Sequence, residues 1–506
     1  MLQQGGNAVD AVIAAAAALT VVEPVSNGLG SDAFAIVWDG KTLHGLDASG
    51  VAPAAWNPDY FERTHKGEIP SRGVDSITVP GAIAGWDALR KRFGTLPYSE
   101  LLAPAINYAA GGYAVAPAIQ QKWKNQIPIL QQQPGFAEVF MPYGRAPNIG
   151  ERMTMPGAAA TLERIALHGA SEFYRGETAE KLVGFLAQHG AALSRSDLEN
   201  YQPEWCGTIS KRYRGYDVHE IPPSGQGIAA LMALGILEHF DLQQYSPDSI
   251  DCRHLQIEAM KLAFADVYRY VGDQRYMQTV NVEALLDGGY LAQRAKLISS
   301  ARAQNFNAGQ PPAGGTIYLT AADANGMLVS YIQSNFMGFG SGVVAPEIGV
   351  SLQNRGAGFT MTAGHPNQVA PGKHPFHTII PGFLMQDGQP RMSFGVMGGS
   401  MQPQGHVQTL TRMLDHQQQP QAACDAARWR VHDGTSIDVE AHMQADVISD
   451  LTAKGHQIQP VSDSYMDFGS GQFIWRLCDA EDATEAIQTG YVAASDSRRD
   501  GYAACC

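Results

Sequence analysis

Apolar and polar positions divide the chain into a helix-rich part and a strand-rich part. In the first 300 residues, apolar side chains recur at helical spacing and predict helices over 8–22, 101–110, 178–189 and 254–270. A short continuous apolar run over 33–38 predicts a strand, because a Gly-containing turn precedes it and Asp39-Gly40 ends it. The pattern therefore predicts a protein that contains both helices and strands.

The pattern changes near residue 300. Residues 296–310 are predicted to be the polar end of a helix, and the following Pro311-Pro312-Ala313-Gly314-Gly315 favours neither helix nor strand. From Thr316 the pattern predicts strands over 316–323 and 327–334, joined as a β-hairpin by an Ala-Asn-Gly turn. The strongest boundary in the sequence therefore lies between residues 315 and 316.

Composition excludes several classes of protein. The 506 residues are 45% hydrophobic and only 17% charged, which is unlike a disordered chain or a coiled coil. The net charge of −14, without a basic stripe, predicts no nucleic-acid partner and no anionic membrane. The longest apolar run, 11–22, is shorter than the roughly 20 residues that a membrane span needs. These features predict a soluble globular enzyme.

Cysteine usage and the start of the chain predict a cytoplasmic protein. The six cysteines show neither a CxxC pair nor zinc-like spacing, which favours free thiols in a reducing compartment. No Lys or Arg precedes Lys41, so a secretory n-region is not indicated. Histidines are scattered singly and no nucleotide-binding fingerprint is present, so no metal and no cofactor is expected.

Thr316 at the boundary has two interpretations. It is either a β-branched residue that opens a strand, or an N-terminal nucleophile. If the Gly315–Thr316 bond were cut, Thr316 would carry both a hydroxyl nucleophile and an α-amine with a pKa near 8 that could accept its proton. Spacing alone leaves both interpretations open.

Motifs along nearly the whole chain resemble the gamma-glutamyltranspeptidase family. The resemblance starts almost at Met1, although members of the family carry further residues before it. The matching segments are Gly5-Gly6-Asn7-Ala8-Val9-Asp10-Ala11, Val22-Glu23-Pro24, Val79-Pro80-Gly81, Phe173-Tyr174-Arg175-Gly176, Pro222-Pro223-Ser224-Gly225-Gln226-Gly227, Glu258-Ala259-Met260-Lys261, Phe339-Gly340-Ser341-Gly342, Gly398-Gly399 and Asp496-Ser497-Arg498.

The resemblance implies a fold, a cleavage site and catalytic residues. It implies an α+β protein, the four-layer αββα sandwich of N-terminal nucleophile hydrolases. Cleavage between Gly315 and Thr316 would give a large subunit, 1–315, and a small subunit, 316–506, within one intertwined domain. Thr316 would be the nucleophile, Ser334 would orient its hydroxyl, and the backbone of Gly398 and Gly399 would receive the oxyanion. Without the resemblance, that Gly-Gly pair would be an ordinary turn.

Residues that bind the glutamyl group in transpeptidases differ in this sequence. The family's arginine is absent from 49–53, and its acidic pair is replaced by Ala357-Gly358. The paired serines become His377-Thr378, and the lid over 364–373 is shortened. A γ-glutamyl group would therefore find few of its usual partners.

Arg355 and His377 suggest a different substrate. A guanidinium can hold a carboxylate bidentately, so Arg355, with His377 and Thr378, could bind a small acid whose amide carbon lies at Thr316. The alternatives are a structural ion-pair arginine and a core histidine. The segments 333–340 and 397–405 resemble the amidohydrolase branch of the family, which includes oxamate amidohydrolase.

We therefore expect a self-processing threonine amidohydrolase that acts on a small carboxylate-bearing amide, with oxamate the leading candidate. γ-Glutamyl hydrolysis or transfer on glutathione, cephalosporin or glutaryl acylase activity, and an unprocessed binding protein are the alternatives. The expected partners are the small-molecule substrate and the two subunits of one precursor. A homo-oligomer of the processed heterodimer is compatible with the sequence.

Overall fold

The structure is a computed structural model that describes residues 1–306, 315–462, 468–477 and 490–505. These residues form two compact units. The first unit contains 1–206 and 315–379, and the second contains 207–306 and the described residues of 380–505. Each unit therefore combines segments from both sides of the 315/316 boundary. The predicted loop residues Pro311 and Pro312 lie outside the described residues.

The first unit is built on a five-stranded antiparallel sheet with the order β5-β2-β1-β9-β8. The predicted hairpin is confirmed as β8 (Gly315–Ala322) and β9 (Leu328–Phe336). The predicted strand at 33–38 is confirmed as β1 (Asp32–Trp38), which pairs with β9. The other two strands are β2 (Leu43–Ala48) and β5 (Glu204–Trp205).

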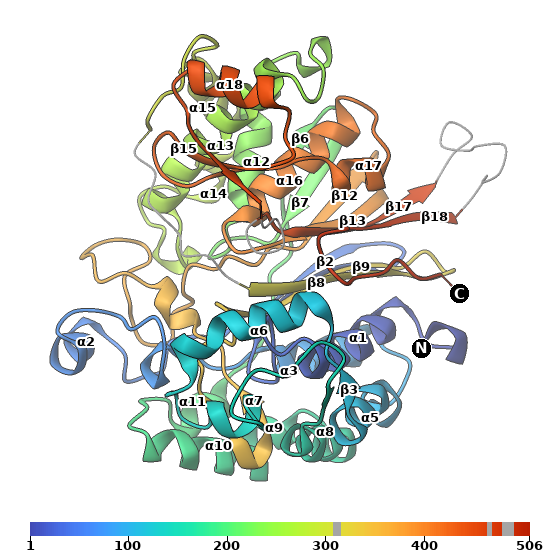
Figure 1. Ribbon diagram of the computed structural model, residues 1–506, viewed down its shortest axis with the longest axis vertical. Helices are drawn as coiled ribbons and strands as arrows, with labels where there is room; N and C mark the ends of the chain where they lie inside the picture. Colours follow the sequence, from blue (N-terminus) through green and yellow to red (C-terminus); the bar gives the residue numbers. More distant parts are fainter. Residues whose placement is uncertain (307–314, 463–467, 478–489, 506) are drawn as a thin grey trace. The chain divides into compact units, whose positions relative to one another are not determined.

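Helices cover this sheet. The first, α1 (Ala8–Val22), begins where Asn7 and Asp10 form a capping box. Together with α3 (Ala82–Phe93) it packs on the strands, and the two lie on the same side of β8 and β9 (Figure 1). The remaining helices of this unit are η1 (Leu2–Gln4), α2 (Pro58–His65), η2 (Val74–Ser76), α4 (Tyr98–Leu101), α5 (Ala103–Gly111), α6 (Pro117–Leu130), α7 (Phe136–Phe140), α8 (Pro156–His168), α9 (Ser171–Arg175), α10 (Glu177–Gln188), α11 (Arg195–Asn200), η5 (Pro346–Ile348) and η6 (Arg355–Gly358), and its short strands are β3 (Tyr113–Ala114), β4 (Arg152–Met153), β10 (Val344–Ala345) and β11 (Val350–Ser351).

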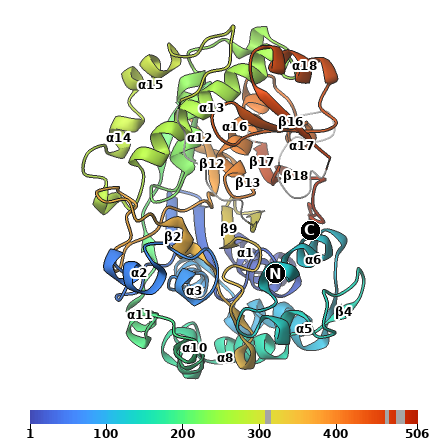
Figure 2. The same cartoon turned by 60° about the vertical axis from the view of Figure 1, so that its left-hand side comes forward.

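The second unit contains a six-stranded antiparallel sheet with the order β18-β17-β13-β12-β7-β6. Helix α12 packs on β6 and β7, α16 packs on β13, and α13 packs on α12 (Figure 2). Every residue of α12 is buried, which explains its uniformly apolar sequence. The strands of the sheet are β6 (Ile209–Tyr213), β7 (Tyr216–Glu220), β12 (Gly382–Gln386), β13 (Gln389–Met397), β17 (Ser470–Leu477) and β18 (Gly490–Ser495); the other elements are α12 (Gly227–Leu237), η3 (Leu242–Gln244), α13 (Ile250–Tyr270), η4 (Gln274–Tyr276), α14 (Val282–Leu285), α15 (Gly288–Ala295), α16 (Met401–Leu414), α17 (Pro420–Asp425), β14 (Trp429–Val431), β15 (Ser436–Glu440), α18 (Ala445–Ala453) and β16 (Gln457–Val461).

Most predicted helices are confirmed, and two need correction. The segments 8–22, 178–189 and 254–270 correspond to α1, α10 and α13. The helix expected over 101–110 is divided, because α4 ends at Leu101 and α5 begins at Ala103 with a proline in its first turn. The polar helix end expected over 296–310 is wrong in its described part, since α15 already ends at Ala295. Backbone groups there bond to other segments, since Ala303 N–H donates to the Lys454 carbonyl and Gln304 N–H donates to Glu258 Oε2.

Helices and antiparallel sheets together confirm the predicted α+β class. Among the described helices, none is both long enough and apolar enough to cross a lipid bilayer.

Candidate active site

Thr316 lies at an irregularity in the hairpin that carries it. Gly315 is paired with Phe336, but Ile317 is paired with Gln333, so two residues of β9 face one residue of β8. Such a bulge changes the direction of a side chain relative to regular pairing. Thr316 is buried, and its Oγ1 donates a hydrogen bond to Ser334 Oγ at 3.2 Å. The two hydroxyl residues that the sequence singled out are therefore in contact.

Ser334 connects Thr316 to Arg355. Its Oγ accepts hydrogen bonds from Arg355 Nη2 at 3.2 Å and from the Phe336 backbone N–H at 2.8 Å. Phe336 has a φ of 77°, a left-handed conformation that is unfavourable for a bulky residue. This conformation accompanies the bond from its backbone N–H to Ser334, and backbone strain of this kind is common at functional sites.

Arg355 is fully buried and belongs to η6. Its Nη1 donates to Thr378 Oγ1 at 2.8 Å, and its Cζ lies 4.3 Å from the centre of the Phe336 ring. Burial lowers the pKa of Arg355 to about 9, and the charge of Asp32 opposes this effect. The guanidinium is thus a fixed cation at neutral pH, separated from Thr316 by a single serine hydroxyl.

Asp32 is a residue of this network that the sequence did not reveal. Its Oδ2 lies 3.9 Å from Arg355 Nε and 3.1 Å from His377 Nε2, and all three side chains are buried. Burial raises the pKa of Asp32 to about 7, while Arg355 and the backbone N–H of Gly50 oppose the rise. Two features of the sequence could have indicated Asp32. It is the one charged residue of an otherwise apolar strand, β1, and a buried arginine such as Arg355 needs a negative partner.

His377 is turned toward Asp32. Nε2 faces the carboxylate, and Nδ1 accepts a long hydrogen bond, 3.4 Å, from the Ile379 backbone N–H. Its ring also packs edge-on against Phe34. Burial lowers the pKa of His377 well below its usual value, and the charge of Arg355 adds to this effect, so the ring is neutral. Both ring nitrogens of His377 therefore contact protein groups, Asp32 and the Ile379 backbone. His377 can influence a bound ligand through its effect on Asp32 and Arg355.

Gly398 and Gly399 lie in the second unit, between the end of β13 and the start of α16. Both have positive φ values, 133° and 61°. A Cβ at Gly398 would come within 2.9 Å of Gly469 Cα, so the position requires glycine. Gln226 Nε2 donates to the Gly399 carbonyl at 2.8 Å and fixes that peptide. The pair is therefore a rigid turn at a helix N-terminus, where backbone amides can bind an anion.

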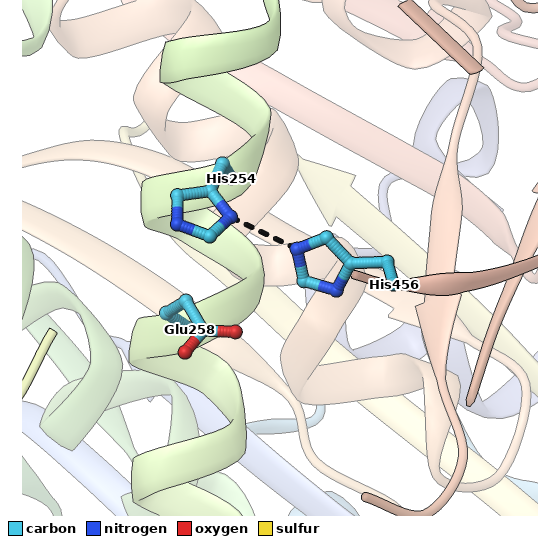
Figure 3. Close-up of side chains that lie close together, drawn as sticks. All are labelled: His254, Glu258 and His456. Carbon is cyan, nitrogen blue, oxygen red and sulfur yellow. Dashed lines mark hydrogen bonds between the residues drawn. The ribbon is translucent and has the colours of Figure 1, made fainter. Parts of the chain in front are cut away.

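A separate buried group in the second unit has metal-ligating residue types. His254 and Glu258 lie one turn apart on α13, and His456 approaches them from another segment (Figure 3). His254 Nδ1 and His456 Nε2 are 2.9 Å apart, and the other nitrogen of His254 contacts the Ser299 carbonyl.

Lys261 makes this group a poor cation site. Its Nζ donates to Glu258 Oε1 at 2.6 Å, so the carboxylate already has a cationic partner. Burial lowers the pKa of both histidines, and the charge of Lys261 contributes to the lowering. A buried position beside the positive charge of Lys261 disfavours a protonated imidazole, and it disfavours a metal cation for the same reason. The structure thus favours an imidazole pair beside a buried ion pair, and the expectation of no metal stays a prediction.

Comparisons with known proteins identify the class. A solved cephalosporin acylase from Bacillus halodurans has a TM-score of 0.93 and 44% identity, over 99% of this chain and 92% of that chain. The fold and this likeness define an enzyme of the N-terminal nucleophile hydrolase class.

Sequence comparisons show the family to which the chain belongs. The model of the gamma-glutamyltranspeptidase family matches residues 1–506, and the chain belongs to that family. It is 35% identical to the glutathione hydrolase-like YwrD proenzyme of Bacillus subtilis strain 168, over 92% of this chain and 89% of that protein. It is 34% identical to the oxamate amidohydrolase proenzyme of Klebsiella pneumoniae, again over 92% of this chain and 89% of that protein.

Proposed function

We propose that the chain is a precursor that cleaves itself between Gly315 and Thr316 and then acts as a threonine amidohydrolase. The contact between Thr316 Oγ1 and Ser334 Oγ supports this assignment, because it orients the hydroxyl that would attack. The proenzyme relatives support the cleavage step. Self-cleavage would proceed by attack of the Thr316 hydroxyl on the Gly315 carbonyl, and hydrolysis of the resulting ester would free the Thr316 amine.

The cleaved enzyme would hydrolyse an amide in two steps. Thr316 Oγ1 attacks the amide carbon while the free α-amine of Thr316 accepts the hydroxyl proton. The amine returns that proton to the leaving nitrogen, which departs as ammonia and leaves an acyl ester on Thr316. Water then cleaves the ester and releases the acid. Gly398 and Gly399 are the proposed oxyanion donors, and one such donor is typically worth about 3–4 kcal/mol.

The observation that carries the substrate assignment is the shared serine hydroxyl. Arg355 Nη2 and Thr316 Oγ1 both contact Ser334 Oγ, so the cation and the nucleophile are neighbours. A carboxylate bound by Arg355 and Thr378 would therefore be bonded directly to the carbon of the scissile amide. Oxamate has this structure, whereas the α-carboxylate of a γ-glutamyl group is separated from its amide carbon by three further carbons. We therefore propose oxamate as the substrate, with oxalate and ammonia as products.

Ammonia release tests the assignment directly. We expect the cleaved wild-type enzyme to release one ammonia per oxamate, and Thr316→Ala to release none. Propionamide, an amide of similar size that lacks the carboxylate, is the matched substrate control, and we expect it to react at least a hundredfold more slowly. Absence of ammonia at millimolar oxamate from cleaved enzyme would overturn the assignment.

Acylase activity is the second candidate, because the solved cephalosporin acylase is 44% identical over 99% of this chain. Release of the side-chain acid from glutaryl-7-aminocephalosporanic acid would favour it. The 35% identity with a glutathione hydrolase-like protein supports γ-glutamyl hydrolysis as a further alternative. Rapid turnover of γ-glutamyl-p-nitroanilide, with no reaction on oxamate, would favour that activity.

A further inference from the structure

Asp32 is surrounded by hydrogen-bond donors. The Gly50 backbone N–H donates to Oδ1 at 2.9 Å, and His377 Nε2 and Arg355 Nε face Oδ2. Because an ionised carboxylate only accepts hydrogen bonds, this arrangement suits its charged form. Burial acts in the opposite direction, since the side chain is fully enclosed.

The buried charges are balanced before a substrate binds. Above pH 7, where Asp32 is ionised, Arg355 carries one positive charge and Asp32 one negative charge, while His377 is neutral. A substrate carboxylate at Arg355 would add a second negative charge to this enclosed group. An uncompensated buried charge costs several kcal/mol, so binding is favourable only if another charge changes.

We propose that the substrate carboxylate binds to Arg355 together with one proton, which enters the pair formed by Asp32 and His377. This inference rests on the proposed role of Arg355 as the carboxylate-binding residue. Asp32 Oδ2 and His377 Nε2 are 3.1 Å apart, so the added proton lies between them and belongs to the pair. The complex then contains one anion, the substrate, opposite one cation, Arg355.

The surroundings of Asp32 set the pH range of this coupling. Its pKa of about 7 lies where a bound anion can raise it further and draw in a proton. Asp47 on β2 also raises the pKa of Asp32, and His374 acts on both Asp47 and His377. Among the described residues, two phenols also interact with Asp32, and burial and the charge of Asp32 raise the pKa values of Tyr174 and Tyr201. In the cleaved enzyme the α-amine of Thr316 is a further titratable group.

Asp32 is thus a positioning residue that makes carboxylate binding depend on pH. Above pH 7 the empty site must take up a proton to bind the substrate, so the Kd of a carboxylate ligand should rise about tenfold per pH unit. In Asp32→Asn the charge is absent, and the substrate alone neutralises Arg355. The Kd for this variant should rise much less steeply than that of the wild type between pH 7 and 8, where Arg355 remains charged, a result that merely local disruption would not produce.

Calorimetry of pyruvate binding to the cleaved enzyme tests the inference. Pyruvate carries a methyl group where oxamate has its amide nitrogen, so it releases no ammonia. Titrations at pH 8 in buffers of different ionisation enthalpy measure the protons taken up per ligand. We expect the wild type and Asp39→Asn, which removes a carboxylate just beyond the other end of β1, to take up about one proton more per ligand than Asp32→Asn, since the Thr316 α-amine is common to all three.

The outcomes separate the two proposals. Pyruvate that binds the wild type without proton uptake would overturn the coupling and leave the carboxylate-binding role of Arg355 intact. Failure of pyruvate to bind at any pH would overturn that role itself. Absence of proton uptake by the wild type would be decisive even if Asp32→Asn fails to fold.

Discussion

Ser334 connects Thr316, the proposed nucleophile, with Arg355, the proposed carboxylate-binding residue. Its hydroxyl contacts Thr316, Arg355 and the backbone of Phe336. We expect Ser334→Ala to lower kcat/KM for oxamate about tenfold to a hundredfold, because loss of a buried hydrogen-bond partner costs about 1–3 kcal/mol. Steady-state ammonia release from the variant and from Ser334→Thr, which keeps the hydroxyl, checks this. Equal losses in the two variants would contradict the role of the hydroxyl.

Arg355 should be irreplaceable by lysine. The guanidinium bonds to Ser334 and Thr378 at once, and it stacks on Phe336. A lysine keeps the charge but lacks the planar fork. We expect Arg355→Lys to raise the KM for oxamate at least tenfold, with a smaller change in kcat. The matched control is Thr378→Val, which keeps the arginine and removes one of its partners, and we expect a KM between those of the wild type and Arg355→Lys. A KM unchanged in Arg355→Lys would show that Arg355 does not hold the substrate.

Several residues near the proposed nucleophile were predictable from the sequence, but the side chains that they contact were not. Thr316, Ser334 and Arg355 could be singled out from motifs and from departures from the family pattern. Asp32 could not, because it is far from Arg355 in sequence and only the pairing of β1 with β9 brings it to the site. His377 was predicted to lie near the substrate, but its orientation could not be predicted, because its Nε2 faces Asp32.

At the scale of elements, the apolar spacing predicted the regular helices and strands, but it did not predict the irregular features of the fold. The helix α1 and the hairpin β8–β9 follow directly from apolar spacing and an Asn-Gly turn. The bulge at Thr316 has no comparable signal, because it arises from pairing between strands. The error over 296–306 has a similar cause, since the backbone N–H groups of Ala303 and Gln304 donate to Lys454 and Glu258, which are distant in sequence.

The capping box of α1 allows a test at this scale. Asn7 accepts a bond from Asp10 N–H, and α1 packs on β8, the strand that carries Thr316. We expect Asn7→Ala to lower the free energy of unfolding by about 1 kcal/mol. Asn7→Ser, which can still cap the helix, should lose less. Thermal unfolding compares the variants, and kcat/KM should remain unchanged. A large loss of activity in Asn7→Ala would mean that α1 contributes to the site and not to stability alone.

At the scale of the whole molecule, both proposed subunits are needed to complete each compact unit. In the sheet of the first unit, β9 and β8 from Thr316 onward belong to 316–506, and β9 pairs with β1, which belongs to 1–315 together with β2 and β5. The second unit likewise pairs β7 with β12. Cleavage between Gly315 and Thr316 should therefore leave two chains that stay associated. Native gel filtration should recover them in one peak, and separation without denaturant would contradict this expectation.

Cleavage at one bond is the central claim, and mass spectrometry of the denatured protein tests it most directly. After incubation, the wild type should give two chains whose masses correspond to 1–315 and 316–506, with Thr316 as the first residue of the smaller one. Thr316→Ala, purified and incubated in parallel, should remain one chain of 506 residues. A wild type that stays intact, or one that is cut at another bond, would contradict the account.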